Sequence, residues 1–260
     1  RERTFCGDLV GGEEAGARLH RDRQEHREHR QRAERRVAER LPRIRRAAQV
    51  GEKTRRRTDE AREAGIEHFI FVTGRNKTAI EDHFDVAVEL YETLSRRGKT
   101  EILERLKAMQ PEPGQTGYTR QQVPLGLGHA VWCARELVGN EPFALLLPDM
   151  IMQSEPGCMK QMVELYMETG GNILAVEECD PAETHKYGIV GRGKETHGGF
   201  EITSMVEKPK PKDAPSNFYI NGRYILQPEI FSLLEDQETG AGGEIQITDA
   251  MLRLHANEPF

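Results

Sequence analysis

The sequence predicts an α/β fold built on a doubly wound, mostly parallel mixed sheet. From residue 59 to the end of the chain, short apolar runs of β character alternate with amphipathic helical patterns. One of these runs, FALLL at 143–147, is continuously apolar, which is typical of a parallel strand buried on both faces. Because such sheets bind ligands at the carboxyl ends of their strands, we expect functional side chains just after each strand.

The chain of 260 residues divides into two segments of opposite charge. Residues 1–58 hold 18 Lys and Arg against 10 Asp and Glu, whereas residues 59–260 hold 19 against 33. The first segment is rich in Arg and Glu and has too few apolar residues to offset the entropy of folding, so we expect it to be disordered or loosely helical. Its interleaved glutamates and scarcity of aromatic residues argue against a nucleic-acid partner.

The cysteines and the hydropathy place the chain in a reducing, aqueous compartment. Cys6, Cys133, Cys158 and Cys179 are far apart and form no C-x-x-C pair, which argues against a zinc site or a disulfide framework. No apolar run approaches 18 residues, so no membrane span is expected. We therefore expect a cytoplasmic protein.

Glycines mark the boundaries of the elements expected in residues 59–260. Gly65 ends the helix DEAREA, Gly74 ends the strand IEHFIFVT, and Gly98 interrupts a helical pattern over 86–109. The other elements expected, in chain order, are a helix at KTAIEDHF, a strand over 118–123, a helix from Gly128, the strand FALLL, a helix over 158–169, strands at NILAVEE, YGIVGR, FEITSMVEKP and NFYINGRYIL, and helices near 228–235 and 245–254.

A glycine turn follows the strand over 118–123. Gln121 ends this strand, Gly126 lies in the turn, and Gly128 begins a helix whose amides could face an anion. A Gln amide both donates and accepts, as the edge of a nucleobase requires, and a glycine lets a flat ring approach the backbone. The spacing is equally consistent with a tight strand–helix connection in which glycine serves packing alone.

Two further strand ends carry charged residues. Asp149 follows the buried strand FALLL, where a carboxylate suits Mg²⁺, although an Asp that caps the next turn is the alternative. Glu207 and Lys208 end the strand before the loop PKPK, where a carboxylate can accept from sugar hydroxyls and a lysine can neutralise a phosphate. Taken alone, this pair is an ordinary exposed strand end.

Taken together, these stretches resemble bacterial UTP–glucose-1-phosphate uridylyltransferases, a family of nucleotidyltransferases with a Rossmann-like fold. The resemblance covers about residues 59–260. It is carried, in order, by GIEHFIFVTGRNKTAIEDHFD, RQQVPLGLGHAV, FALLLPDM, KYGIVG, MVEKPKPKDAPSNFYINGRYIL and GGEIQITDAM.

The resemblance implies an activity and a set of site residues. The activity is the formation of UDP-glucose and pyrophosphate from UTP and glucose 1-phosphate, with Mg²⁺ as cofactor. The implied catalytic residues are Asp149 and Lys208. His129 is not needed as a general base, because a phosphomonoester dianion is already nucleophilic. The implied binding roles are Gln121 and Gly126 for the uracil, Asp149 for Mg²⁺, Gly188 and Glu207 for the glucose, and Lys208 for its phosphate.

The chain also departs from the family. The family's first strand and its glycine-rich triphosphate loop, G-x-G-T-R, are not found in residues 1–58, and the chain ends before the family's Y-D-C-G segment. We therefore expect a C-terminally truncated nucleotidyltransferase domain over 59–260 without the first central strand. Two alternatives to the uridylyltransferase are a remnant that binds uridine nucleotides without turnover and a related thymidylyltransferase. The resemblance also implies a homo-oligomer.

Overall fold

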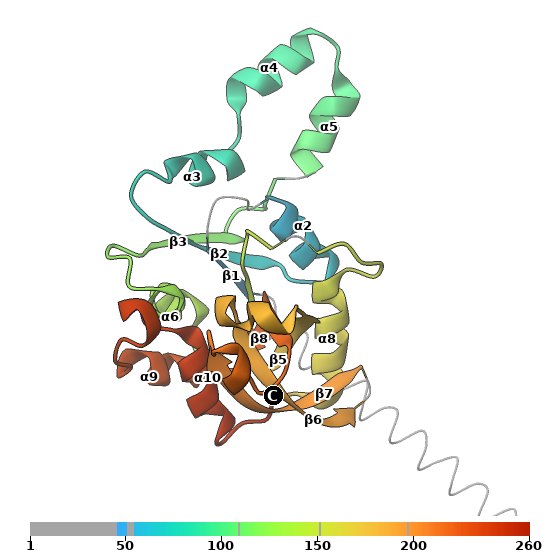
Figure 1. The fold of residues 1–260 in the computed structure, drawn as a ribbon. Coiled ribbons are helices and arrows are strands. Elements are labelled where there is room, and N and C mark those ends of the chain that lie inside the picture. The colour runs from blue at the N-terminus through green and yellow to red at the C-terminus, as the bar shows by residue number, and fades with distance from the viewer. Residues whose placement is uncertain (1–45, 51–54, 109, 151, 197) are drawn as a thin grey trace, which may run out of the picture. The chain divides into compact units, whose positions relative to one another are not determined.

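The structure, a computed structural model, describes residues 46–50, 55–108, 110–150, 152–196 and 198–260 (Figure 1). The strands in these residues form one mixed sheet in the order β3-β2-β1-β4-β8-β6-β7, and β5 pairs with β8 beside this path. The predicted α/β class is therefore confirmed. The strands are β1 (Arg46–Val50), β2 (His68–Thr73), β3 (Thr116–Arg120), β4 (Phe143–Leu146), β5 (Ile173–Glu178), β6 (Gly188–Thr196), β7 (Gly199–Glu207) and β8 (Phe218–Leu226).

Strand direction divides the sheet into two parts. β3, β2, β1 and β4 run parallel to one another, whereas β8 is antiparallel to β4, β5 and β6, and β6 is antiparallel to β7. The parallel part has its carboxyl ends on one edge, which is where a doubly wound sheet binds its ligands.

The central strand β1 differs from the prediction. It lies between β2 and β4 and pairs with both, so the expectation that the first central strand is missing is wrong. Ladder hydrogen bonds join backbone groups, which every residue type except proline can supply in full, so a segment with a weak β pattern can fill the middle of a sheet. Helix α2 (Arg55–Glu63) also begins before residue 59. The expected absence of the triphosphate loop concerns residues 1–58, of which 1–45 and 51–54 lie outside the described residues.

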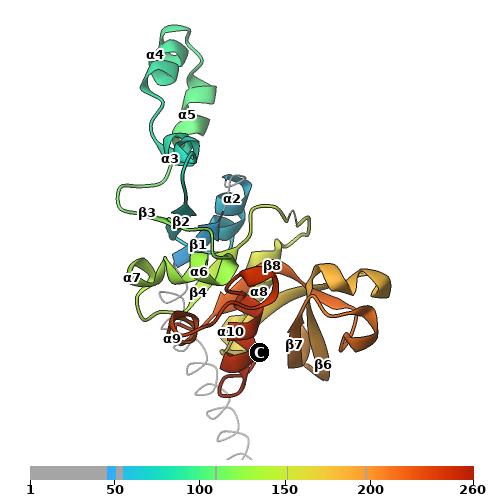
Figure 2. The same cartoon turned by 60° about the vertical axis from the view of Figure 1, so that its left-hand side comes forward.

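Alternate strand residues pack into two cores on opposite faces of the sheet. Figure 2 gives a second view of the sheet and of the helices beside it. In β4, Phe143 and Leu145 belong to one core, whereas Ala144 and Leu146 belong to the other, and all four are fully buried. Burying one Leu or Phe side chain contributes roughly 1.5–3 kcal/mol. The first core is covered by α6 (Leu127–Trp132), α7 (Arg135–Val138), α9 (Ile230–Glu235) and α10 (Ile247–His255), and the second by α2, α3 (Thr78–Phe84) and α8 (Cys158–Thr169).

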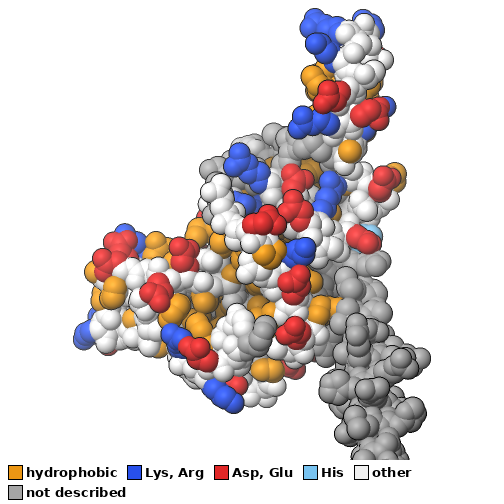
Figure 3. Space-filling model, turned by 90° about the vertical axis from the view of Figure 1, so that its right-hand side faces the viewer, with side chains coloured by type: hydrophobic (Ala, Val, Ile, Leu, Met, Phe, Trp, Pro, Cys, Tyr) orange, Lys and Arg blue, Asp and Glu red, His pale blue; other side chains and the backbone are white. Residues whose placement is uncertain are grey.

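Helices α4 (Val88–Arg96) and α5 (Thr100–Ala108) stay outside both cores. Gly98, with φ +64°, separates them, as the interrupted pattern predicted. α4 buries none of its residues and α5 buries only Leu103, so the apolar positions of this stretch do not cover the sheet. Figure 3 shows this pair of helices at the top, with hydrophobic side chains exposed among charged ones. In the part of the chain that is described, no helix combines the length and the apolar character that a membrane crossing needs.

Candidate functional site

Two predicted site residues follow strands whose carboxyl ends share one edge of the sheet. Gln121 follows β3, and its N–H donates to the carbonyl of Thr73 at the end of β2 over 2.9 Å. Asp149 comes shortly after β4, which ends at Leu146. Because β2 and β1 lie between β3 and β4, these two strands are roughly 14 Å apart at a usual strand spacing. A ligand that reaches both residues must be extended, as a nucleoside triphosphate can be.

The amide of Gln121 has a fixed orientation. Its Nε2 donates to the carbonyl of Gly126 over 2.9 Å and lies 3.1 Å from Nδ1 of His129. A carbonyl can only accept, so the NH₂ group must face Gly126, and Nδ1 takes its second hydrogen when the His129 proton is on Nε2. Within the described residues Oε1 has no hydrogen-bond partner. Gln121 therefore presents an acceptor, and only an acceptor, to a ligand.

The two glycines of the turn have a structural explanation. A Cβ on Gly126 would lie 2.7 Å from Cβ of Glu244 and 2.9 Å from the carbonyl oxygen of Ile245, and Gly126 has φ +102°. The N–H of Gly128 donates to that same carbonyl over 2.9 Å, and Ile245 N–H donates to Leu125 over 2.7 Å. The close neighbour of the turn is thus another part of the chain. Because its amide already donates to Ile245, Gly128 does not offer that amide to an anion.

Asp149 is exposed beyond the end of β4. Its carboxylate forms no hydrogen bond or ion pair with any residue that the structure describes. No group of three or more His, Cys, Asp or Glu residues that could hold a metal ion occurs in the described part of the chain. An ion at Asp149 would therefore rely on this one carboxylate and on substrate oxygens, which is how Mg²⁺ is commonly held beside nucleotide phosphates.

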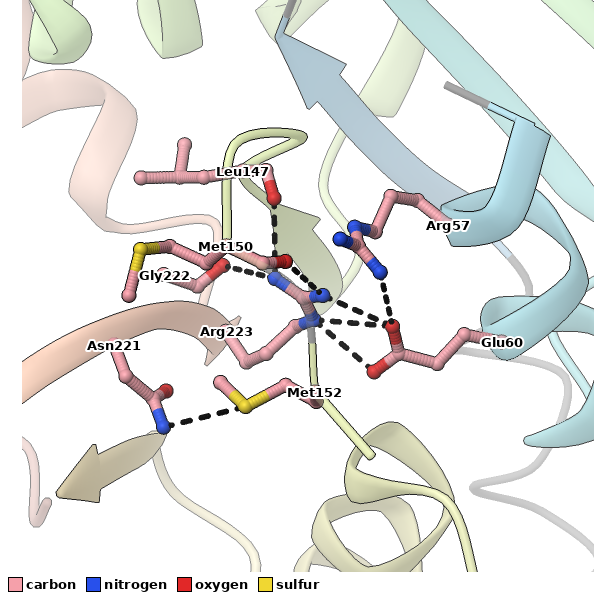
Figure 4. A network of polar contacts seen from close by, with 8 residues as sticks. All are labelled: Arg57, Glu60, Leu147, Met150, Met152, Asn221, Gly222 and Arg223. Carbon is pink, nitrogen blue, oxygen red and sulfur yellow. Dashed lines mark hydrogen bonds and ion pairs between the residues drawn. The ribbon is translucent and has the colours of Figure 1, made fainter. Parts of the chain in front are cut away.

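A buried arginine holds the backbone on both sides of Asp149 (Figure 4). Arg223 in β8 is completely buried. Its Nη1 donates to the carbonyls of Leu147 and Gly222, each over 3.1 Å, and its Nη2 donates to the carbonyl of Met150 over 3.0 Å. Leu147 N–H in turn donates to the carbonyl of Gly222 over 2.9 Å. The short loop that carries Asp149 is therefore tied to β8 at both ends.

The remaining donors of Arg223 go to Glu60 in α2. Nε lies 3.0 Å from Oε1, and Nη2 lies 2.9 Å from Oε2, so the pair is bidentate. Arg57 adds a second, longer contact to Glu60 at 3.6 Å. Burial, and then the nearby charge of Arg223, lower the pKa of Arg57. Removing one partner from such a buried ion pair costs about 3–5 kcal/mol, because the other charge is left without compensation.

A second cluster forms where β6, β7 and α10 meet. Gly188 pairs with Glu207 in the ladder, and a Cβ on Gly188 would lie 3.1 Å from both Glu207 Oε2 and Thr248 Oγ1. Thr248 donates its hydroxyl to Glu207 Oε2 over 2.7 Å, and Lys208 Nζ lies 3.4 Å from Oε1. The structure therefore brings the predicted residues Gly188, Glu207 and Lys208 together and adds Thr248 to them.

Lys208 adopts a conformation that is uncommon for a residue with a side chain. Its φ of +48° lies in the left-handed region, which costs roughly 1–2 kcal/mol for an L-residue. Its N–H donates to the carbonyl of Tyr187 over 2.9 Å, which holds the strained turn in place. The ammonium-bearing side chain is about half exposed, so it is available to an anion.

Tyr224 in β8 is buried. Burial raises the pKa of its hydroxyl, and the negative charges of Glu207 and Asp149 raise it further. The pKa of Asp249 is also raised, first by burial and then by Glu207.

The stretch from Glu244 to Thr248 connects the glycine turn with the second cluster. Ile245 exchanges backbone hydrogen bonds with the turn, and Thr248, three residues later, donates to Glu207. A cavity of about 700 Å³ lies elsewhere, along α8 and β5, and its lining includes none of the predicted site residues.

The comparison with family models decides the family. The nucleotidyl transferase model matches residues 60–259, which is more than half of the chain. The chain belongs to the nucleotidyl transferase family. This agrees with the predicted resemblance over about 59–260.

Relatives and solved structures of the nucleotidyl transferase family agree with this assignment. A UTP–glucose-1-phosphate uridylyltransferase of Komagataeibacter xylinus is 47% identical over 202 residues, covering 78% of this chain and 71% of the relative. One of Bacillus subtilis is 48% identical over 197 residues, covering 76% and 67%. A UDP-glucose pyrophosphorylase solved with UDP-glucose has a TM-score of 0.71 at 34% identity, covering 84% of this chain and 89% of that one.

A UTP-bound enzyme of this kind from Acinetobacter baumannii has a TM-score of 0.72 at 33% identity and covers 83% of this chain and 84% of its own. A Bacillus anthracis protein described as a glucose-1-phosphate thymidylyltransferase is only 16% identical at a TM-score of 0.54, so that likeness shows the fold alone.

Sequence reasoning did not identify Arg223, Glu60 or Thr248. A charged residue inside an otherwise apolar strand, as Arg223 is in NFYINGRYIL, is the signal that could have found the first. Glu60 lies beside other acidic residues in its helical pattern, whereas Thr248 is the one hydroxyl residue of α10, and in both cases only the partner shows the role.

Proposed function

We propose that this chain transfers the uridylyl group of UTP to glucose 1-phosphate, forming UDP-glucose and pyrophosphate. Relatives named for this activity are 47% and 48% identical to it and are covered over 71% and 67% of their length. The observation that carries the proposal is that Gln121 and Asp149 follow parallel strands whose carboxyl ends share one edge of the sheet.

The base would be recognised at the turn after β3. Uracil carries a hydrogen-bond donor at N3, and Gln121 presents an acceptor toward the ligand side. Cytosine has an acceptor at N3, so the same oxygen would repel it. Gly126 would leave the base room on the side that Glu244 and Ile245 do not occupy.

The sugar phosphate would be recognised at the second cluster. Glu207 keeps lone pairs beyond its bond to Thr248 and could accept from glucose hydroxyls beside Gly188, where a side chain would fill the space. Lys208 would release its 3.4 Å contact with Glu207 and approach the phosphate, as its exposed side chain allows. Its positive charge would reduce the repulsion between the two reacting phosphates.

The reaction would be a direct in-line displacement. An oxygen of the glucose 1-phosphate dianion attacks the α-phosphorus of UTP and forms the new P–O bond, while the bond from that phosphorus to the bridging oxygen breaks and pyrophosphate leaves with the electron pair. Positioning and charge neutralisation suffice for this step. His129 is occupied by Gln121 and is not needed as a base.

Asp149 would hold Mg²⁺ together with the nucleotide phosphates. The fit rests on its carboxylate, which is exposed and forms no hydrogen bond or ion pair with any described residue. When bound, Mg²⁺ supplies positive charge against the charge that develops on the transferring phosphate.

The test is turnover of the purified full chain with UTP, glucose 1-phosphate and Mg²⁺, with UDP-glucose and pyrophosphate both measured. We expect both products, and we expect Asp149→Ala to lower kcat about 100- to 1,000-fold. Asp213→Ala, at another exposed aspartate, is the matched control and should leave kcat unchanged. Binding of uridine nucleotides without product would favour the inactive remnant instead. Turnover with dTTP as good as with UTP would favour a thymidylyltransferase.

The proposal also includes a homo-oligomeric state and a cytoplasmic location. Val88, Leu90 and Ile102 expose apolar surface on α4 and α5, which supports a homo-oligomer that covers it. The described cysteines are free thiols, which supports the cytoplasm. Light scattering on a sizing column tests the first, and a single monomer peak would contradict it; cell fractionation tests the second.

A further inference from the structure

We propose that Arg223, oriented by Glu60, is a positioning residue that presets the Asp149 loop for the metal–nucleotide complex. This inference rests on the proposed function, because it takes Asp149 as the residue that meets the metal. Neither Arg223 nor Glu60 has to touch a substrate for it to hold.

The hydrogen bonds of Arg223 account for every donor it has. A guanidinium carries five N–H groups in a planar fork. Nε donates to Glu60, Nη1 donates to Leu147 and Gly222, and Nη2 donates to Glu60 and Met150. Such complete use of a buried fork fixes the guanidinium plane and, with it, the carbonyls that it holds.

The acceptors of this fork are placed for a positioning role. Leu147 and Met150 lie on either side of Asp149 in the sequence, and the loop between them contains Pro148, whose φ is fixed. The backbone around Asp149 is therefore held on both sides while its carboxylate stays exposed. A ligand of this carboxylate meets a group whose backbone is already ordered, so less entropy is lost on binding.

Stability alone does not explain the buried pair. Replacing a buried ion pair by well-packed apolar residues is often neutral or stabilising. An apolar pair between α2 and β8 would satisfy the packing, since Ala61 of α2 and Ile225 of β8 already share this core. What an apolar pair cannot do is donate to the carbonyls of Leu147 and Met150.

This difference defines the experiment. The double variant Glu60→Met/Arg223→Met keeps volume in the core and removes both members of the bidentate pair, and it also removes the 3.6 Å contact of buried Arg57 with Glu60. Arg223→Lys is the second variant, and it keeps one charge but not the planar fork, so it serves if the double variant folds poorly. Ile225→Val is the matched control, because Ile225 lies two residues further along β8 on the same face of the sheet and its apolar side chain cannot donate to either carbonyl.

Two readouts are needed, and the first does not depend on activity. Hydrogen exchange of the amides of Leu147, Asp149 and Met150 is measured in the ligand-free full chain. We expect exchange about tenfold faster in the double variant and unchanged in the control. The second readout is Mn²⁺ affinity in the presence of UTP, which we expect to weaken about 10- to 100-fold, while the KM for glucose 1-phosphate stays the same.

Amide hydrogen exchange at the wild-type rate in both the double variant and Arg223→Lys would overturn the proposal. Faster exchange without a loss of Mn²⁺ affinity would also overturn it. Failure of the proposed function looks different. In that case Asp149→Ala leaves the Mn²⁺ affinity of the UTP complex as it is in the wild type, while the exchange experiment still reports whether Arg223 holds the loop.

Discussion

His129 should contribute to base selection without touching the base. In the substitution His129→Phe, the ring that stacks near Trp132 at 5.9 Å is kept, but the acceptor Nδ1 beside Gln121 is lost. Gln121 then holds its orientation through the Gly126 carbonyl alone.

The expected effect follows from the hydrogen bonds that oppose a flip of the amide. To accept CTP, Gln121 must turn its NH₂ group toward the base and break two hydrogen bonds. At about 0.5–1.5 kcal/mol each, these favour UTP by roughly 1–3 kcal/mol, or about 5- to 150-fold. Without the His129 contact one bond remains, so the preference for UTP over CTP should fall about 2- to 12-fold.

The assay compares kcat/KM for UTP and for CTP at saturating glucose 1-phosphate. His185→Phe is the matched control, since His185 is exposed and, among the described residues, its ring bonds only to the carbonyl of Ala182. We expect the melting temperature and the KM for glucose 1-phosphate of His129→Phe to match those of the wild type. An unchanged UTP-to-CTP ratio would show that His129 does not hold the amide.

Three further predictions concern the phosphate, the pH and the N-terminal boundary. Lys208→Ala should raise the KM for glucose 1-phosphate about tenfold and leave the KM for UTP unchanged, and an equal rise in both would contradict its assignment. Asp249→Asn should raise the melting temperature more at pH 8 than at pH 4. Because the pKa of Asp249 is raised in the folded state, its ionised carboxylate opposes folding at pH 8. This penalty disappears as the pH falls through the pKa of the folded state. Deleting residues 1–42 leaves every described element in place and should preserve cooperative melting, whereas deleting 1–58 removes β1 and should abolish it; intact melting of the shorter chain would show that β1 is dispensable.

Local patterns were sufficient for the class of fold and the positions of most elements. The strand β4 and the helix α8 lie where the apolar run and the helical pattern placed them. Gln121 and Asp149 reach one edge because the strands before them are parallel, and this could be inferred from alternating elements alone. The helices and strands in the C-terminal half of the domain could also be predicted from the spacing of apolar residues and the positions of glycines alone.

What could not be predicted depends on partners that are distant in sequence. Glu60 and Arg223 are 163 positions apart, and nothing in either local pattern points to the other. β1 was missed because its stability comes from the backbones of β2 and β4 on either side. The sequence predicts that something approaches the backbone closely at Gly126, but it does not show that Glu244 and Ile245, more than a hundred residues later, do so.

That same segment gives the glycine turn a role beyond packing. Because Gly126 and Gly128 have no side chains, Ile245 can exchange hydrogen bonds with the turn, and this fixes the start of α10 two residues later. Thr248 at that start donates to Glu207. Residues 245–248 thus join the turn proposed to bind the base to the cluster proposed to bind the sugar. At one end of this stretch Ile245 is held by backbone hydrogen bonds, and at the other the hydroxyl of Thr248 donates to Glu207. A side chain at either glycine would displace Ile245, at a cost of about 1–3 kcal/mol, and the displacement would reach Glu207 through Thr248. The spacing of the two glycines therefore bears on both substrates, although neither glycine needs to contact the sugar.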